Sequence, residues 1–199
     1  MIKSYEIVNI ELLKPLEKVF PNHLKNLSRL IIESKIVETP IIADQKTGIV
    51  LDGSHRYVFF LQHGYKKVPV KFVNYNDENI RVGSLLIHRH LVDQRNTLSK
   101  DEVVKRGMSG TLFPPRTTRH FFPFRKNEYI NVYLKDLTKG DELDVNDLIA
   151  NVDIQQEIDH NKNYLKEIEN EFDELIRYME EIRQTKMYLI KQLSLLENS

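Results

Sequence analysis

The most informative segment of the chain is Leu51-Asp52-Gly53-Ser54-His55-Arg56-Tyr57. The apolar run before it has the pattern of a short buried strand, and the apolar run after it predicts a short helix that Gly64 ends. A helix that begins in such a turn presents free backbone N–H groups and a partial positive charge to an anion. Gly53 lets the backbone approach a ligand closely. The segment therefore predicts a strand-to-helix turn that binds phosphate.

The charged side chains of this turn suggest chemistry as well as binding. His55 and Arg56 offer donors that suit phosphate oxygens. Asp52 would be repelled by a phosphate unless it has a task, and two tasks are plausible. It could hold Mg²⁺, or it could take the proton from an attacking hydroxyl. The alternative is structural: Asp52 and Ser54 cap the helix, Arg56 pairs at the surface and His55 packs.

Composition excludes several classes of protein. The 199 residues include 29 basic and 29 acidic side chains, and this zero net charge argues against a general nucleic-acid binder. The absence of cysteine excludes disulfides, zinc–thiolate sites and thiol catalysis. No stretch resembles a signal peptide or reaches the length of a membrane span, so we expect no membrane association and a cytoplasmic protein.

The remaining patterns predict a small α+β domain over residues 1–137. Strands are expected at residues 5–10, 39–43, 48–51, 67–73 and 130–134, and helices at residues 21–34, 57–61 and 99–108. Pro69 suggests that its strand lies at an edge of the sheet. Residues 84–88 could be strand or helix. His88 and His90 are interpreted as ordinary residues rather than a metal pair.

A second polar segment lies between Pro115 and Pro123, and these two prolines together with Pro114 disfavour regular structure. It contains Thr117, Thr118, Arg119 and His120. Arginine, threonine hydroxyl and imidazole together form a set that can bind phosphate or carboxylate. The alternative is a solvated loop whose phenylalanines reach into the core.

The composition changes beyond residue 137. Residues 138–160 are predicted to be a linker with a short helix, and residues 161–199 a coiled-coil helix. Apolar residues recur there in alternating steps of three and four from Leu165 to Leu196, with Lys186 as the one polar interruption. A second copy of the chain is the simplest partner for this stripe, so we predict a homodimer. An antiparallel pair, a larger bundle or docking on the domain remain open.

The order of these elements is similar to the ParB/sulfiredoxin-like fold, a small mixed sheet with flanking helices. Ser54 stands where sulfiredoxin has its catalytic cysteine, and the motifs that follow the turn in chromosome-partitioning ParB proteins are absent. A third branch, the free L-serine kinases, matches in three motifs. These are Lys14-Pro15-Leu16-Glu17, which resembles Lys-Pro-x-Glu; Asp52-Gly53-Ser54-His55-Arg56, which resembles Asp-Gly-His-His-Arg; and Pro115-Arg116-Thr117-Thr118-Arg119-His120, which resembles Pro-Lys-Thr-Thr-Arg-His.

The resemblance implies transfer of a phosphoryl group from ATP or ADP to the hydroxyl of free L-serine, giving O-phospho-L-serine. It implies catalytic roles for Glu17 and Asp52, one as the base and the other on Mg²⁺ or the substrate ammonium group. The metal is assigned to Asp52. Nucleotide binding is assigned to Gly53, Ser54, His55, Arg56 and Thr39, and substrate binding to Thr117, Thr118, Arg119 and His120.

Three alternatives remain open at this stage. The first is a kinase for another small hydroxyl compound. The second is a nucleotide-binding adaptor without turnover that recruits a partner through its coiled coil. The third is a ParB-like DNA-associated protein, which the zero net charge disfavours.

Overall fold

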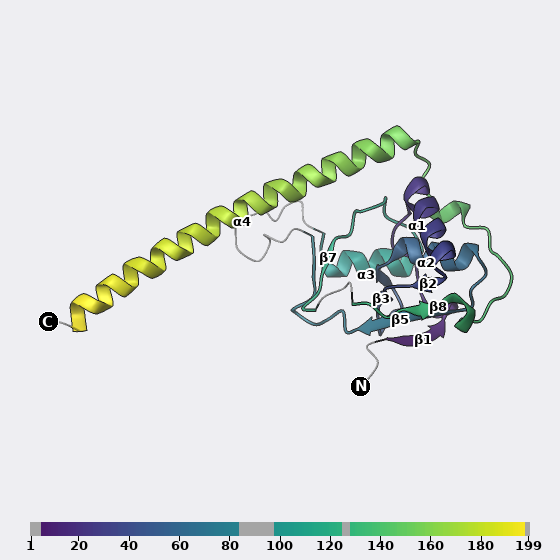
Figure 1. Ribbon diagram of the computed structural model, residues 1–199, viewed down its shortest axis with the longest axis horizontal. Coiled ribbons are helices and arrows are strands. Elements are labelled where there is room, and N and C mark those ends of the chain that lie inside the picture. The colour runs from purple at the N-terminus through teal and green to yellow at the C-terminus, as the bar shows by residue number, and fades with distance from the viewer. Residues whose placement is uncertain (1–4, 84–97, 125–127, 198–199) are drawn as a thin grey trace.

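The computed structural model describes residues 5–83, 98–124 and 128–197. The segment that contains His88 and His90 lies outside these residues. Figure 1 shows a small α/β unit at one end of the molecule and a single long helix that extends away from it. Within the described ranges, every helix is too short or too polar to cross a membrane.

A mixed four-stranded sheet forms the centre of the domain, as the sequence predicts. Its order is β1 (Glu6–Asn9), β5 (Lys67–Val73), β3 (Ile41–Asp44) and β4 (Val50–Asp52). The pairs β1–β5 and β3–β4 are antiparallel, and β5–β3 is parallel. The hairpin between β3 and β4 brings the chain directly to the predicted phosphate turn.

The prediction that Pro69 marks an edge strand is wrong, because β5 lies between β1 and β3. The register explains how proline is accommodated. Pro69 pairs with Ile7 of β1, whereas the pairing of β5 with β3 begins at Val70. Proline has no N–H group to donate, and its half of β5 is flanked by one strand only.

Two helices cover the sheet next to the turn. Pro21 begins α1 (Pro21–Ser34), and α2 (Ser54–Gln62) starts in the turn itself. The two helices contact each other, and their buried side chains include Leu24, Ile31, Phe59 and Phe60. Packing on this core fixes the first turn of α2, and with it the orientation of the predicted site.

The remaining elements are short, apart from α3 (Lys100–Ser109). Ser99 and Glu102 form the predicted capping box at its start. Two small ladders join β2 (Ile36–Val37) to β8 (Val132–Tyr133) and β6 (Arg81–Val82) to β7 (His120–Phe121). Single 3₁₀ turns lie at η1 (Ile10–Leu12), η4 (Leu134–Asp136) and η5 (Asn146–Leu148).

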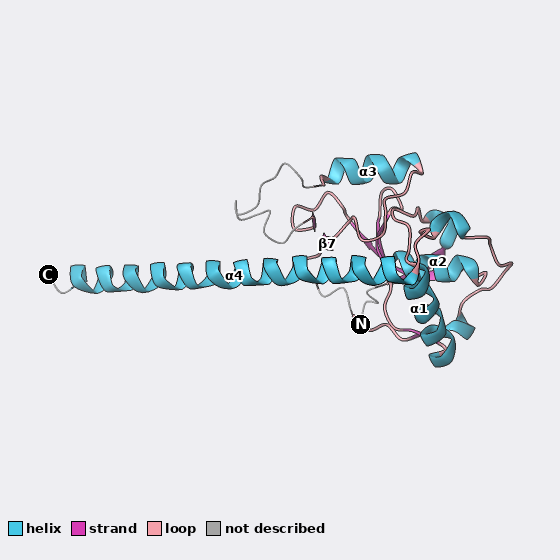
Figure 2. Ribbon diagram, turned by 90° about the horizontal axis from the view of Figure 1, so that it is seen from above, coloured by secondary structure: helices cyan, strands magenta, loops and turns pink. Residues whose placement is uncertain are grey.

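The C-terminal helix α4 (Ile154–Glu197) begins earlier than the predicted residue 161. At 1.5 Å per residue it is roughly 66 Å long, and Figure 2 shows it running past the domain and beyond it. Its first turn is tied to α1. The buried Glu157 carboxylate accepts hydrogen bonds from the backbone N–H groups of Asn22 (3.0 Å) and His23 (2.9 Å). Phe20, the N-cap of α1, provides no side-chain cap, so Glu157 fills that role.

Candidate active site

The three predicted motifs meet around one cavity of about 310 Å³. The predicted residues that line it are Glu17, Asp52, Gly53, Ser54, His55, Arg56, Thr118, Arg119 and His120. They come from the loop before α1, the β4–α2 turn and the segment that leads into β7. The chain thus gathers most of the candidate residues in one place.

The β4–α2 turn has the geometry that an anion site requires. Gly53 is the N-cap of α2 with a φ of 95°, in the left-handed region that favours glycine. A Cβ atom at this position would lie 2.8 Å from Arg56 Nη2. The N–H groups of Ser54, His55 and Arg56 precede the first intrahelical bond, which Tyr57 N–H donates to the Gly53 carbonyl at 2.9 Å.

Arg56 stabilises the turn from within. Its Nη2 donates to Asp52 Oδ2 and to the Pro40 carbonyl, both at 3.1 Å. Arg56 Nε is buried and has no protein partner among the described residues. This nitrogen lies 3.1 Å from the position that a Cβ atom on Gly53 would take, so glycine at position 53 leaves room for the guanidinium.

His55 is a neutral ring in this site. Its Nε2 accepts the backbone N–H of Phe20 at 3.1 Å, and its ring stacks on His23 with 4.1 Å between centroids. Burial, together with the positive charges of His23, Arg116 and Arg56, lowers the pKa of His55 to about 3. The proton of the neutral ring is therefore on Nδ1. His55 can donate one hydrogen bond to a phosphate but brings no charge.

Glu17 is the most perturbed acid of the cavity. Its carboxylate accepts the N–H and hydroxyl of Thr118, the latter at 2.6 Å, and the N–H of Arg116 at 3.2 Å. Burial raises the pKa of Glu17 from 4.5 to about 7, and these hydrogen bonds oppose the shift. An acid with this pKa is half ionised near neutral pH, which suits a group that exchanges a proton with a substrate.

A short backbone ladder brings Glu17 to the Thr118 segment. Phe113 N–H donates to the Leu16 carbonyl and Lys18 N–H donates to the Phe113 carbonyl, both at 2.9 Å. Arg116 follows with a φ of 59°, an uncommon conformation for a residue with a side chain. This conformation lets the loop turn its N–H groups onto Glu17.

Two predicted residues lie outside the cavity lining. Thr117 is exposed, and its hydroxyl donates to the Pro114 carbonyl at 2.9 Å, which closes a local turn. Thr39 is half-buried beside Pro40, the residue whose carbonyl contacts Arg56. In the described structure, neither side chain forms a hydrogen bond with the other predicted site residues.

Sequence reasoning did not assign His23, Arg116 or Tyr164 to the site, although all three line the cavity. Tyr164 comes from α4, and the Arg116 guanidinium lies 5.0 Å from its ring centroid. Glu171, also in α4, pairs with Arg119 at 2.8 Å. In the sequence these α4 residues look like the solvated side of a coiled coil, so no local signal distinguishes them.

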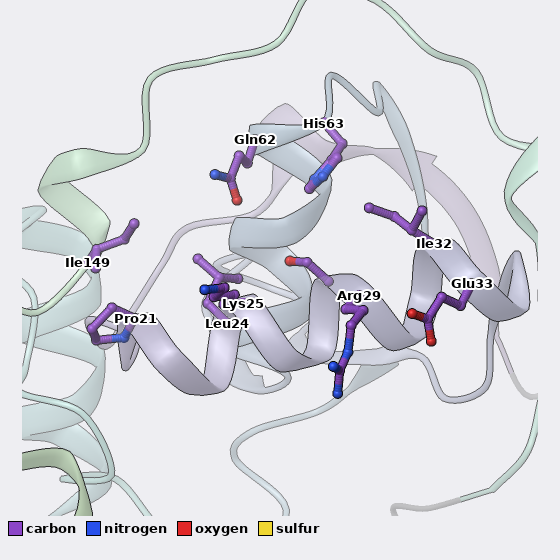
Figure 3. A pocket seen from close by; sticks show the side chains of 10 residues that line it. Pro21, Leu24, Lys25, Arg29, Ile32, Glu33, Gln62, His63 and Ile149 are labelled. Carbon is purple, nitrogen blue, oxygen red and sulfur yellow. The ribbon is translucent and has the colours of Figure 1, made fainter. Parts of the chain in front are cut away.

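A second, larger hollow of about 540 Å³ lies along the other side of α1. Figure 3 shows that it is lined by α1, the end of α2 and Ile149, with Lys25, Arg29 and His63 among its side chains. It contains none of the predicted site residues.

The described residues include no group of three or more acidic, histidine or cysteine side chains that could hold a metal ion by themselves. Mg²⁺ commonly binds one or two carboxylates and takes its other ligands from phosphate oxygens and water. Asp52, at the anion-binding end of α2, fits that single protein ligand.

Comparisons with known proteins point to serine kinases and a ParB-like protein. No family model matches the chain. An ATP-dependent L-serine kinase from Staphylothermus marinus is 36% identical over 80 residues, which cover 38% of this chain and 32% of that kinase. A ParB-like protein from Sulfolobus acidocaldarius is 42% identical over 43 residues, 22% of each chain. The matched part thus spans about a third or less of these curated relatives.

The solved structure of a free serine kinase in complex with AMP superimposes with a TM-score of 0.57. The superposition covers 68% of this chain and 94% of that chain, with 15% sequence identity. The chain shares the fold of the free serine kinases. The predicted fold class and the resemblance on which it was based are therefore confirmed.

Proposed function

We propose that this protein is a free L-serine kinase that transfers the terminal phosphoryl group of ATP or ADP to the serine hydroxyl and releases O-phospho-L-serine. One observation carries the proposal. Glu17, the Asp52–Arg56 turn and Thr118–His120 are distant in sequence but line a single cavity. The name of the Staphylothermus marinus relative favours ATP as the donor.

The donor phosphates would lie at the N-terminus of α2. Residues 54–56 begin α2 and line the cavity, so their N–H groups and the Nδ1–H of His55 would hold phosphate oxygens. Bound Mg²⁺, with Asp52 as its protein ligand, would neutralise charge on the phosphates. A free serine kinase of the same fold binds AMP, which supports nucleotide binding by this chain.

Glu17 is the better candidate for the base. The serine oxygen attacks the terminal phosphorus, the bond from that phosphorus to the nucleotide breaks, and the hydroxyl proton passes to Glu17. A base with a pKa of about 7 can accept this proton and return it to solvent. Arg119, Thr118 and His120 would bind the substrate carboxylate and the transferred group. A cytoplasmic location fits a reaction that consumes free nucleotide and amino acid, and remains a proposal.

Phosphorus NMR of the full chain with Mg²⁺, L-serine and either ATP or ADP tests this function. We expect a phosphoserine signal, and the nucleotide that produces it faster identifies the donor. A signal only with another hydroxyl compound would move the assignment to a different acceptor. Nucleotide binding without any phosphorylated product would contradict the kinase and favour the adaptor.

We further propose that α4 joins two copies of the chain. Its apolar stripe is solvent-exposed in the single chain, at Leu165, Phe172, Met179, Ile182, Leu189, Leu193 and Leu196. The helix face that contacts the domain carries Glu157, Tyr164 and Glu171. This face overlaps the first part of the stripe, where Ile168 and Leu175 are half-buried, whereas every described residue beyond Tyr178 is exposed. The same helix can therefore dock on its own domain and pair with a second copy.

Light scattering of the full chain should give about twice the 23.6 kDa mass of the monomer. Leu189→Glu places a charge in the stripe and should dissociate the dimer. Tyr188→Glu is the matched control, because Tyr188 is next in sequence and similarly exposed in the single chain, at 62% against 54%, but lies off the stripe. A wild-type monomer at all concentrations, or equal effects of both substitutions, would contradict the coiled coil.

A further inference from the structure

The first half of α4 is part of the catalytic domain. Glu157, Tyr164 and Glu171 are spaced by seven residues, about two helical turns, so they lie on one face. Glu157 caps α1, Tyr164 lines the cavity and Glu171 pairs with Arg119. From Met179 to Glu197 every residue of α4 is exposed. The docked section therefore ends near Tyr178, and it lies where the third motif borders the cavity.

The contacts of Arg119 come from both the domain and α4. Its Nη1 lies 2.8 Å from Glu171 Oε2, and its guanidinium lies 4.9 Å from the ring centroid of Phe121 and 5.8 Å from that of Tyr164. The side chains of Arg119 and Glu171 are only 21% and 17% exposed. This bond uses Nη1, and the planar guanidinium carries further N–H groups that can bind a carboxylate.

Tyr164 contacts both arginines of the third motif. The guanidinium of Arg116 lies 5.0 Å from its ring centroid, and the backbone N–H of Arg116 donates to Glu17. Cation–π contacts of this kind favour an arginine over the face of the ring. One aromatic side chain of α4 therefore touches two positively charged groups next to the proposed base.

We infer that Tyr164 and Glu171 are positioning residues that complete the acceptor site by holding Arg116 and Arg119 ready for the carboxylate of the amino-acid substrate. This inference rests on the proposed function. A free arginine side chain loses much rotational freedom when a ligand orders it. An arginine that α4 has already ordered binds the carboxylate at a smaller entropic cost. Disturbing these residues should therefore weaken acceptor binding more than the chemical step.

Steady-state kinetics of the full chain test the inference. Glu171→Gln and Tyr164→Leu should each raise KM for L-serine on the order of tenfold, with kcat within about twofold and KM for the nucleotide unchanged. Tyr164→Phe keeps the ring face and should retain wild-type KM. Glu180→Gln is the matched control, because Glu180 is an exposed acid on the undocked part of α4 that pairs with Arg183 at 3.6 Å.

Unchanged KM for serine in Glu171→Gln and Tyr164→Leu would overturn the inference while leaving the kinase proposal intact. Equal increases in KM for L-serine and KM for the nucleotide, together with a lower Tm, would also overturn it, since they would indicate a purely structural role. If the wild type forms no phosphoserine, calorimetric titration with O-phospho-L-serine tests the positioning role independently of catalysis. Weaker binding to Glu171→Gln than to Glu180→Gln supports the positioning role, and equal affinity or no binding overturns it.

Discussion

Glu17→Gln is expected to lower turnover by about 10² to 10⁴, the usual contribution of a general base, and to stabilise the folded protein at pH 8. Both effects have the same cause. Burial raises the pKa of Glu17 to about 7, so the folded protein must hold a carboxylate in a site that disfavours its charge. Glutamine has nearly the same shape and can still accept a hydrogen bond from Thr118, but it neither ionises nor accepts a proton.

The direction of the pH effect follows from the two protonation states. Between pH of about 4.5 and about 7, the folded protein keeps a proton on Glu17 that the unfolded chain has lost. Its free energy of unfolding therefore falls as pH rises through this window and stays level above it. At 1.36 kcal/mol per pKa unit, the wild type loses up to about 3 kcal/mol, and Glu17→Gln avoids this loss. Thr118 and Arg116 will form weaker hydrogen bonds to glutamine than to a carboxylate, so the gain in stability of Glu17→Gln will be smaller than this.

Urea unfolding at pH 5 and pH 8 measures the stability difference, with exposed Glu11→Gln as the control. The same pKa predicts that kcat/KM of the wild type rises with pH to about 7 and then levels off. Wild-type turnover in Glu17→Gln would remove Glu17 from the mechanism. A stability difference from the wild type that is the same at both pH values would contradict the raised pKa.

Elements with local signals could be predicted from the sequence. Pro21 at the first position of α1 and the Ser99–Glu102 capping box mark where their helices begin, and both lie where expected. Gly53 likewise marks the turn before α2. In each case the deciding interaction is within a few residues in sequence, so pattern alone is sufficient.

Interactions between distant segments were harder to predict. No periodicity connects Glu17 to Thr118, and the ladder between Leu16 and Phe113 brings them together. Only the resemblance to a family suggested that the two residues share a site. His55 was expected to offer a donor to phosphate, and no local signal indicated that its Nε2 also accepts the N–H of Phe20, a residue that only the folded chain places beside it. The contacts of α4 were unpredictable for a similar reason, because heptad patterning reveals apolar stripes and the docking residues are polar.

Asp52→Asn is the other substitution for which we expect a large effect, a loss of turnover of at least about 10². Asp52 faces the cavity and accepts from Arg56 Nη2, so the change removes a negative charge from the site and weakens the turn. The side chains of Asp52 and Arg56 are mostly shielded from solvent, at 26% and 19% exposed. We nevertheless expect Asp52→Asn to lower the free energy of unfolding by only about 1 kcal/mol, because Arg56 keeps its hydrogen bond to the Pro40 carbonyl. The exposed Asp141→Asn is the matched control and should change neither property.

A double-mutant cycle separates the two roles of Asp52. If Asp52 acts only by holding Arg56, then Asp52→Asn should cause no further loss in an Arg56→Gln background, because the interaction is already absent. If Asp52 also serves the phosphates through Mg²⁺, turnover should fall in both backgrounds and the concentration of Mg²⁺ needed for half-maximal rate should rise on the order of tenfold. We expect the second result, because Arg56 supplies one positive charge beside Asp52, and the several negative charges of a bound nucleotide would need Mg²⁺ as well. Full turnover in Asp52→Asn would instead make the acid a structural partner of Arg56.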